Sequence, residues 1–225
     1  MWQRFKDRYE AGRLLAEQLL QFADKNDVIV LALPRGGVPV AYEVAKALNV
    51  PLDVFIVRKL GVPGHEELAL GSIASGGTTF INEPFVKTLG LPKDVLDSII
   101  KREETELARR ERLYRGARPP LDVRGKTVIV VDDGLATGST MRAAVTAIRK
   151  MDPERIVVAV PVCAPQTRDE LEVNVDTWCI CVRSPEPFYA VGLWYADFEQ
   201  TSDAEVQNLL ARADAGSVDS RHHVV

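Results

Sequence analysis

The stretch Val128-Ile129-Val130-Val131-Asp132-Asp133-Gly134-Leu135-Ala136-Thr137-Gly138-Ser139-Thr140 organises the rest of the chain. Its four β-branched apolar residues predict a buried parallel strand that ends at two adjacent carboxylates. A loop of small and hydroxyl-bearing residues follows, and an amphipathic helix comes after it. In open α/β sheets ligands bind outside the carboxyl ends of the strands, so this loop is a candidate binding site.

The residue types in this loop indicate what it binds. Backbone N–H groups and the hydroxyls of Thr137, Ser139 and Thr140 can face one phosphate, with the N-terminus of a helix behind it. The carboxylates of Asp132 and Asp133 would repel that phosphate unless another group lies between them. A ribose suits this position because each carboxylate can accept hydrogen bonds from its hydroxyls. The stretch therefore describes a ribose 5-phosphate site.

Two other phosphate motifs are excluded. A P-loop needs a lysine before its Ser/Thr, and here Ser139 follows Gly138 directly. A dinucleotide fingerprint needs the spacing G-x-G-x-x-G, which Gly134 and Gly138 do not have.

All thirteen positions resemble the phosphoribosyl pyrophosphate (PRPP) motif of type I phosphoribosyltransferases, with Gly134 as a mild departure. The resemblance implies an α/β fold, a doubly wound and mostly parallel sheet with a flexible loop and a small hood. It also implies that Asp133 takes part in catalysis. The residues that would bind the ribose 5-phosphate are Asp132, Asp133, Leu135, Ala136, Thr137, Gly138, Ser139 and Thr140.

A second loop of similar character follows the predicted strand 28–33. It contains Arg35, Gly36 and Gly37, where two glycines allow close backbone approach and the arginine fork suits phosphate. The next strand, 52–57, stops at Arg58 and Lys59, two cations at the same edge of the sheet. The resemblance implies that these five residues bind pyrophosphate, and that Arg58 and Lys59 are catalytic. A plain tight turn and a solvated pair of cations are the structural alternatives.

Residues 60–78 contain five glycines and one proline, which predicts a long mobile loop. The resemblance implies that this loop closes over the active site, with His65 as a candidate catalytic group; a solvated His65 without a function is the alternative. Residues 92–116 predict a long, highly charged helical insertion, whose thin apolar stripe suits a subunit contact.

The segment 183–200 is rich in aromatic residues and resembles the hood that closes the base site of purine phosphoribosyltransferases. Its candidate acceptor-binding residues are Phe188, Tyr189 and Trp194, since a flat acceptor needs a stacking face. The resemblance makes Asp197 a candidate metal ligand, with Mg²⁺ otherwise held by PRPP and water. A hydrophobic edge that packs on the first helix, predicted at 8–24, is the alternative.

The composition suits one domain, expected at 1–215, followed by a disordered tail at 216–225. The chain has 225 residues, is 46% hydrophobic and 27% charged, and carries a net charge of -4. It lacks a membrane-spanning run and a general attraction to nucleic acid, so we expect a cytoplasmic protein. We also expect a homodimer. Cys163, Cys179 and Cys181 are expected to be reduced packing residues.

The resemblance implies an enzyme that transfers 5-phosphoribosyl from PRPP to a nitrogen acceptor, of which a nucleobase is the expected kind. Mg²⁺ would be its cofactor and pyrophosphate its second product. Two further hypotheses stay open at this point. One is a PRPP- or nucleotide-binding regulatory module without transferase activity, because a fold does not by itself fix a function. The other is a different reaction that consumes or hydrolyses PRPP.

Overall fold

The structure is a computed structural model that describes residues 3–175 and 178–219, without the side chains of 66–67, 173–175 and 216–219. Its centre is a five-stranded sheet in the order β2-β1-β6-β7-β8, and every neighbouring pair in it is parallel. The strands are β1 (Val28–Ala32), β2 (Leu52–Val54), β6 (Thr127–Val131), β7 (Arg155–Val162) and β8 (Trp178–Arg183). The predicted α/β fold with a parallel sheet is confirmed.

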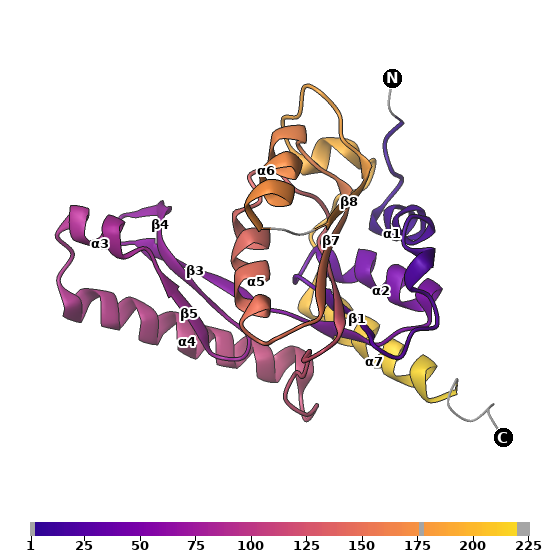
Figure 1. Cartoon of the computed structure of the whole chain (residues 1–225), viewed down its shortest axis with the longest axis horizontal. Coiled ribbons are helices and arrows are strands. Elements are labelled where there is room, and N and C mark those ends of the chain that lie inside the picture. Colours follow the sequence, from indigo (N-terminus) through magenta and orange to yellow (C-terminus); the bar gives the residue numbers. More distant parts are fainter. Residues whose placement is uncertain (1–2, 176–177, 220–225) are drawn as a thin grey trace.

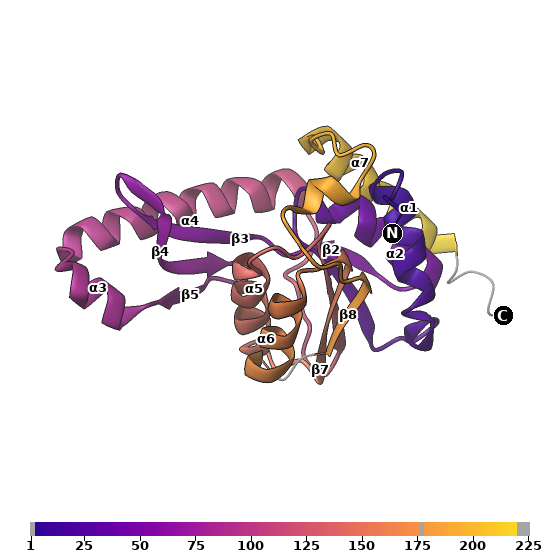
Figure 2. The ribbon, with the colours of Figure 1, turned by 90° about the horizontal axis from the view of Figure 1, so that it is seen from above.

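Helices cover both faces of this sheet, as Figure 2 shows from above. One face carries α1 (Arg8–Glu17), which continues into a 3₁₀ turn at Leu20–Phe22, together with α2 (Gly37–Leu48) and α7 (Asp203–Asp219). The other face carries α5 (Ser139–Arg149) and α6 (Pro165–Val175). Helix α7 runs beyond residue 215, so the prediction of a disordered tail from 216 is wrong for residues 216–219. Residues 220–225 lie outside the described part.

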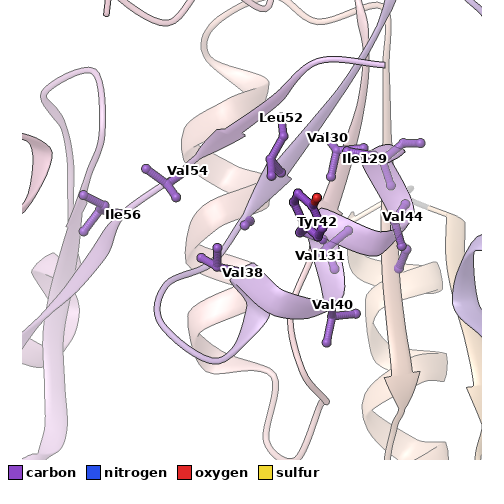
Figure 3. Packing of buried hydrophobic residues seen from close by; sticks show 14 of the residues in the cluster. Val30, Val38, Val40, Tyr42, Val44, Leu52, Val54, Ile56, Ile129 and Val131 are labelled. Atoms are coloured by element: carbon purple, nitrogen blue, oxygen red, sulfur yellow. The ribbon is translucent and has the colours of Figure 1, made fainter. Parts of the chain in front are cut away.

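The alternation of side chains along each strand separates two hydrophobic cores. Val30 and Ile129 point to the side of α2, where they lie near Tyr42 and Val44 (Figure 3). Their neighbours in sequence, such as Leu31, point to the side of α5. Both faces of the central strands are fully buried, which explains why these strands read as continuous apolar runs.

The prediction of a long mobile loop at 60–78 is wrong in its secondary structure, and the mobility of this region stays a prediction. This region belongs to a second, antiparallel sheet of β3 (Val57–Val62), β4 (His65–Ala74) and β5 (Thr78–Ile81). Helix α3 (Glu83–Leu89) follows, and the long helix α4 (Lys93–Arg115) lies where a long helix was predicted. We call residues 57–89 the arm, because they project from the central sheet along α4 (Figure 1).

The end of α4 is tied to the central sheet by a buried polar cluster around Asp53. Arg115 and Arg118 both donate hydrogen bonds to the Asp53 carboxylate, at 3.0 to 3.2 Å. Arg118 also bonds Asp214 of α7, at 2.7 Å. The Asp53 side chain is 12% exposed and those of Arg115 and Arg118 are 13% and 17% exposed. The cluster therefore joins β2, α4 and α7.

We expect Asp53→Ala to lower the free energy of unfolding by about 3–5 kcal/mol, because it leaves two largely buried guanidinium groups without their carboxylate. Urea denaturation followed by circular dichroism measures this change. The matched control is Glu106→Gln, which removes a carboxylate that also pairs with two arginines but is more exposed than Asp53, at 28% against 12%. It should cost less than about 1 kcal/mol. Equal losses in the two variants would contradict the prediction.

The chain leads from β1 to β2 on one side of it and later returns to β6 on its other side. Open α/β sheets bind ligands at such a switch in strand order, which here lies between β1 and β6. Ala32 pairs with Val131 at the last position of the ladder, so the loops after the two strands start side by side. These are the two loops that contain the predicted phosphate-binding residues. Within the described residues, no helix combines the length and the apolar character needed to cross a bilayer.

Candidate active site

The loop 134–138, which we call the phosphate loop, is held from behind by the backbone of residues 162 and 164 and by two side chains. The N–H of Leu135 donates to the carbonyl of Val162, at 2.9 Å, and the N–H of Ala164 donates to the carbonyl of Leu135, also at 2.9 Å. Thr167 donates to the carbonyl of Ala136, and Arg142 to that of Thr137. Three consecutive carbonyls and the N–H of Leu135 are engaged by the protein, so the N–H groups of residues 136–138 are the backbone groups left to bind a ligand.

A pocket of about 180 Å³, which we call the phosphate pocket, lies over this loop. It is lined by Asp132, residues 134–141 and Val191. Helix α5 begins at Ser139 behind Gly138, whose backbone has a φ of +67°. Thr137, Ser139 and Thr140 are exposed. The structure thus brings together the predicted phosphate-binding residues at the N-terminus of a helix, an arrangement that favours an anion.

Asp132 and Asp133 are half-buried at the edge of this pocket and have different partners. Oδ1 of Asp132 accepts the N–H of Asp133, at 2.9 Å. Oδ2 of Asp133 accepts Nε and Nη2 of Arg8, at 2.9 and 2.8 Å. Burial raises the pKa of both carboxyls; the charge of Asp133 raises that of Asp132 further, while Arg8 works against the rise at Asp133.

The loop after β1 lies directly against these carboxylates. A Cβ atom built on Gly36 would lie 2.1 Å from Oδ2 of Asp133. One built on Gly37 would lie 2.8 Å from the carbonyl oxygen of Val131 and 2.9 Å from Cα of Asp132. The peptide bond between Pro34 and Arg35 is cis. Only glycine fits at 36 and 37, and this close approach joins the two predicted anion loops into one site.

The three predicted cations lie in different surroundings. Arg35 is 3.6 Å from a carboxylate oxygen of Asp203 on α7. Arg58 forms two hydrogen bonds with Glu103 on α4, at 2.9 and 2.6 Å. Lys59, the next residue along β3, is exposed and lines a groove of about 320 Å³ with Ser139 and Thr140. Lys59 is therefore the one of these three cations that shares a cavity with the phosphate loop.

A family model described as the phosphoribosyl transferase domain matches residues 1–191. The chain belongs to the phosphoribosyl transferase domain family. A putative phosphoribosyl transferase of Mycobacterium tuberculosis is 42% identical over 221 residues, which are 96% of this chain and 49% of that protein. The chain thus spans about half the length of this curated relative.

Two further proteins are similar to this chain in sequence or in fold. The bifunctional protein PyrR of Chloroflexus aurantiacus is 34% identical over 129 residues, 56% of this chain and 65% of PyrR. The crystal structure of TT1426 from Thermus thermophilus is 39% identical, has a TM-score of 0.80, and covers 93% of this chain and 98% of that one. The fold of this phosphoribosyl transferase domain is thus shared over nearly its whole length.

His65 lies at the turn between β3 and β4 of this phosphoribosyl transferase domain, where it is exposed and pairs with Val62. Three residues of strand, roughly 10 Å, separate Val62 from Lys59. His65 therefore lies toward the end of the arm, away from the phosphate loop, and its catalytic role stays a prediction.

The predicted acceptor residues do not share one environment. Phe188 and Trp194 pack against a buried cluster that contains Phe5 and Tyr195, next to α1. Tyr189 is 78% exposed. The packing of Phe188 and Trp194 follows the structural alternative of a hydrophobic edge on the first helix. Within the hood it is Val191 that reaches the phosphate pocket.

Asp197, the candidate metal ligand, accepts the N–H of Glu199 at 3.1 Å and so stabilises a turn in the hood. It lines a separate pocket with Arg8 and Glu205. Across residues 3–175 and 178–219, no three His, Cys, Asp or Glu side chains are grouped closely enough to hold a metal ion. The metal-binding role of Asp197 stays a prediction.

Sequence reasoning missed three residues that support the site: Arg8, Arg142 and Thr167. Arg8 reaches Asp133 from α1, and Arg142 and Thr167 bond the carbonyls of the phosphate loop from α5 and α6. Arg142 follows the motif by two positions and could have been suspected, whereas Thr167 lies beyond the next strand. Nothing in the sequence links Arg8 to an acid that lies 125 positions away.

Proposed function

We propose that this chain transfers the 5-phosphoribosyl group of PRPP to a ring nitrogen of a nucleobase-like acceptor and releases pyrophosphate. The observation that carries the proposal is the approach of Gly36 to Asp133 at the switch between β1 and β6. It sets a glycine loop suited to pyrophosphate directly beside two carboxylates suited to ribose hydroxyls. The phosphate pocket completes a site for the three parts of PRPP.

In this proposal the nitrogen of the acceptor forms a bond to C1 of the ribose as the bond from C1 to the pyrophosphate oxygen breaks, and the acceptor gives up a proton. Catalysis consists of positioning and electrostatic stabilisation. The backbone of 135–140 binds the 5-phosphate, and Asp132 and Asp133 bind the ribose hydroxyls. The loop of Gly36 and Gly37 binds pyrophosphate.

The cations would balance the charge of the leaving group. Lys59 is free to do so where it stands, because it is exposed beside Ser139 and Thr140. Arg35 and Arg58 would have to leave Asp203 and Glu103, or act through their charge at a distance. Lys59→Ala is therefore expected to raise the KM for PRPP more than Arg58→Ala does.

Mg²⁺ would enter with PRPP, because magnesium is usually bound through substrate phosphates and water rather than by a cage of protein ligands. When bound, it would neutralise part of the pyrophosphate charge. The acceptor role of Phe188, Tyr189 and Trp194 and the closure of the arm remain parts of the proposal.

The test is the release of pyrophosphate from PRPP and Mg²⁺, measured with a panel of purine and pyrimidine bases. Release that depends on one base is the expected result. Tight binding of PRPP without release across the panel would contradict a transferase and favour a binding module. Release without any base would indicate hydrolysis of PRPP instead.

The raised pKa values of Asp132 and Asp133 predict the acid limit of PRPP binding. Ribose binding needs ionised carboxylates, so affinity is complete above the raised pKa values and is lost as the pH falls through them. This loss should begin well above about 4, the ordinary range for a carboxyl. Carboxyl ¹³C NMR titration of the free protein measures the pKa values directly, with Asp132→Asn to assign the signals. Ordinary pKa values at both positions would contradict the prediction.

A further inference from the structure

The first residue of α1, Arg8, reaches from the N-terminal part of the chain into the ribose region of the site. Asp7 caps the helix by accepting the N–H of Glu10, at 2.8 Å, which fixes where Arg8 starts. Nε and Nη2 of Arg8 both contact the same oxygen, Oδ2 of Asp133. The side chains are 11% and 16% exposed, so the pair is largely shielded from water.

The hood holds the other side of this guanidinium. Nη1 of Arg8 donates to the carbonyl of Glu199, at 2.7 Å, and its Cζ lies 3.9 Å from the centre of the Phe198 ring. The hydroxyl of Tyr195 donates to the backbone carbonyl of Asp133, at 2.6 Å. Asp133 is thereby held at its side chain by α1 and at its backbone by the hood.

This arrangement leaves acceptor capacity free on both acids. Within the described residues, the hydrogen bonds to these two carboxylates reach Oδ1 of Asp132 and Oδ2 of Asp133. The second oxygen of each carboxylate is available to a ligand. Two oxygens at neighbouring positions match the two adjacent hydroxyls of a ribose.

We propose that Arg8 is a positioning residue that orients Asp133 for the ribose hydroxyls of PRPP by engaging one carboxylate oxygen and leaving the other free. The inference rests on the proposed function, because it assigns Arg8 a task in PRPP binding. Arg8 touches Asp133 and acts on the donor through it. Two charged groups face Asp133: Arg8 from α1, and Asp132, which precedes Asp133 in the sequence. The titratable Tyr195 faces Asp133 from the hood.

The test is isothermal titration calorimetry of PRPP with Mg²⁺ on the wild type, Arg8→Gln and Arg8→Lys. Loss of two charged hydrogen bonds to one carboxylate should weaken PRPP binding by about 10- to 100-fold in Arg8→Gln. Arg8→Lys keeps the charge but can direct fewer donors, so it should recover part of the loss. Arg13→Gln is the matched control, because Arg13 lies on the same helix, is 57% exposed and pairs only loosely with Glu43, at 3.8 Å.

Two further measurements separate positioning from a purely structural role. The KM for PRPP should rise in Arg8→Gln while the KM for the acceptor stays unchanged, and the acid limit of PRPP binding should move to higher pH. Circular dichroism establishes that each variant is folded; if Arg8→Gln is not, Arg8→Lys carries the comparison with the wild type.

Unchanged PRPP affinity in a folded Arg8→Gln variant would overturn the inference while leaving the proposed function intact. Tighter binding in that variant would also overturn it, since Arg8 would then compete with the ribose. Failure of the wild type itself to bind PRPP would instead refute the proposed function.

Discussion

The double variant Asp132→Asn/Asp133→Asn is expected to lose measurable binding of PRPP. Each carboxylate accepts a charge-assisted hydrogen bond from a ribose hydroxyl in our proposal, and such bonds contribute about 1.5–3 kcal/mol each. An amide keeps one acceptor oxygen but loses the charge and turns an N–H₂ donor toward the ligand. Losing two such bonds corresponds to roughly a 10²- to 10⁴-fold fall in affinity. Isothermal titration calorimetry with PRPP and Mg²⁺ measures it.

The two single variants should change the stability of the fold in opposite directions. The raised pKa of Asp132 means that its ionised form is disfavoured in the folded chain, so ionisation lowers stability as the pH rises through the raised value. Asp132→Asn removes this cost and keeps an acceptor for the N–H of Asp133, so its Tm at neutral pH should rise. The pKa of Asp133 is also raised by burial, but Arg8 works against that rise. Asp133→Asn leaves the largely buried Arg8 without its ion pair, and this loss should lower the Tm.

Glu104→Gln, which replaces an exposed carboxylate on α4, serves as the control for charge alone. It should change neither the PRPP affinity nor the Tm. Unchanged PRPP affinity in the double variant would refute the ribose assignment. A fall in Tm for Asp132→Asn as large as that for Asp133→Asn would contradict the difference between the two acids.

Gly138→Ala is the second substitution from which we expect a large effect. Its φ of +67° disfavours any other residue, and an added Cβ would lie 2.6 Å from Cγ2 of Thr167. Thr167 donates to the carbonyl of Ala136, so a shift of its side chain disturbs the phosphate loop from behind. PRPP affinity should fall by more than about 10-fold, since strain of this kind costs on the order of 1–3 kcal/mol.

Gly125→Ala provides a matched control for this experiment. Gly125 has nearly the same φ, +66°, but a Cβ there would meet no atom within 4 Å. It should therefore show the backbone strain without the clash, as a lower free energy of unfolding with normal PRPP affinity. The prediction fails if the two variants bind PRPP equally well.

The sequence predicted the parts of the molecule whose signals are local. Continuous apolar runs predicted the strands of the central sheet, and the motif at 128–140 predicted the loop and the helix after it. The strands β3 and β4 of the arm escape prediction because the glycines of 60–78 favour a loop. Gly71 is instead needed within β4, since a Cβ there would lie 2.0 Å from the carbonyl oxygen of Phe80 on the neighbouring strand.

The partners of the predicted site residues could not be read from the chain. Arg58 and Lys59 are adjacent in sequence, but side chains alternate along a strand. Only the fold shows that Arg58 bonds Glu103 on α4, while Lys59 lines a groove beside the start of α5. The contact of Arg8 with Asp133 depends on how α1 packs on the sheet. The packing of Phe188 and Trp194 on a core could not be predicted, because aromatic residues pack against a core as readily as they stack on a ligand.

The two carboxylates of the candidate site and its exposed cation Lys59 stand on two separate sheets. Asp132 and Asp133 follow a strand of the central parallel sheet, while Lys59 belongs to the antiparallel sheet of the arm. A tilt of the arm would therefore alter the potential experienced by a polyanionic donor and leave the geometry of the carboxylates unchanged. Affinity for such a donor could accordingly be adjusted, by mutation or by contact with another chain, at positions far from any atom that touches it.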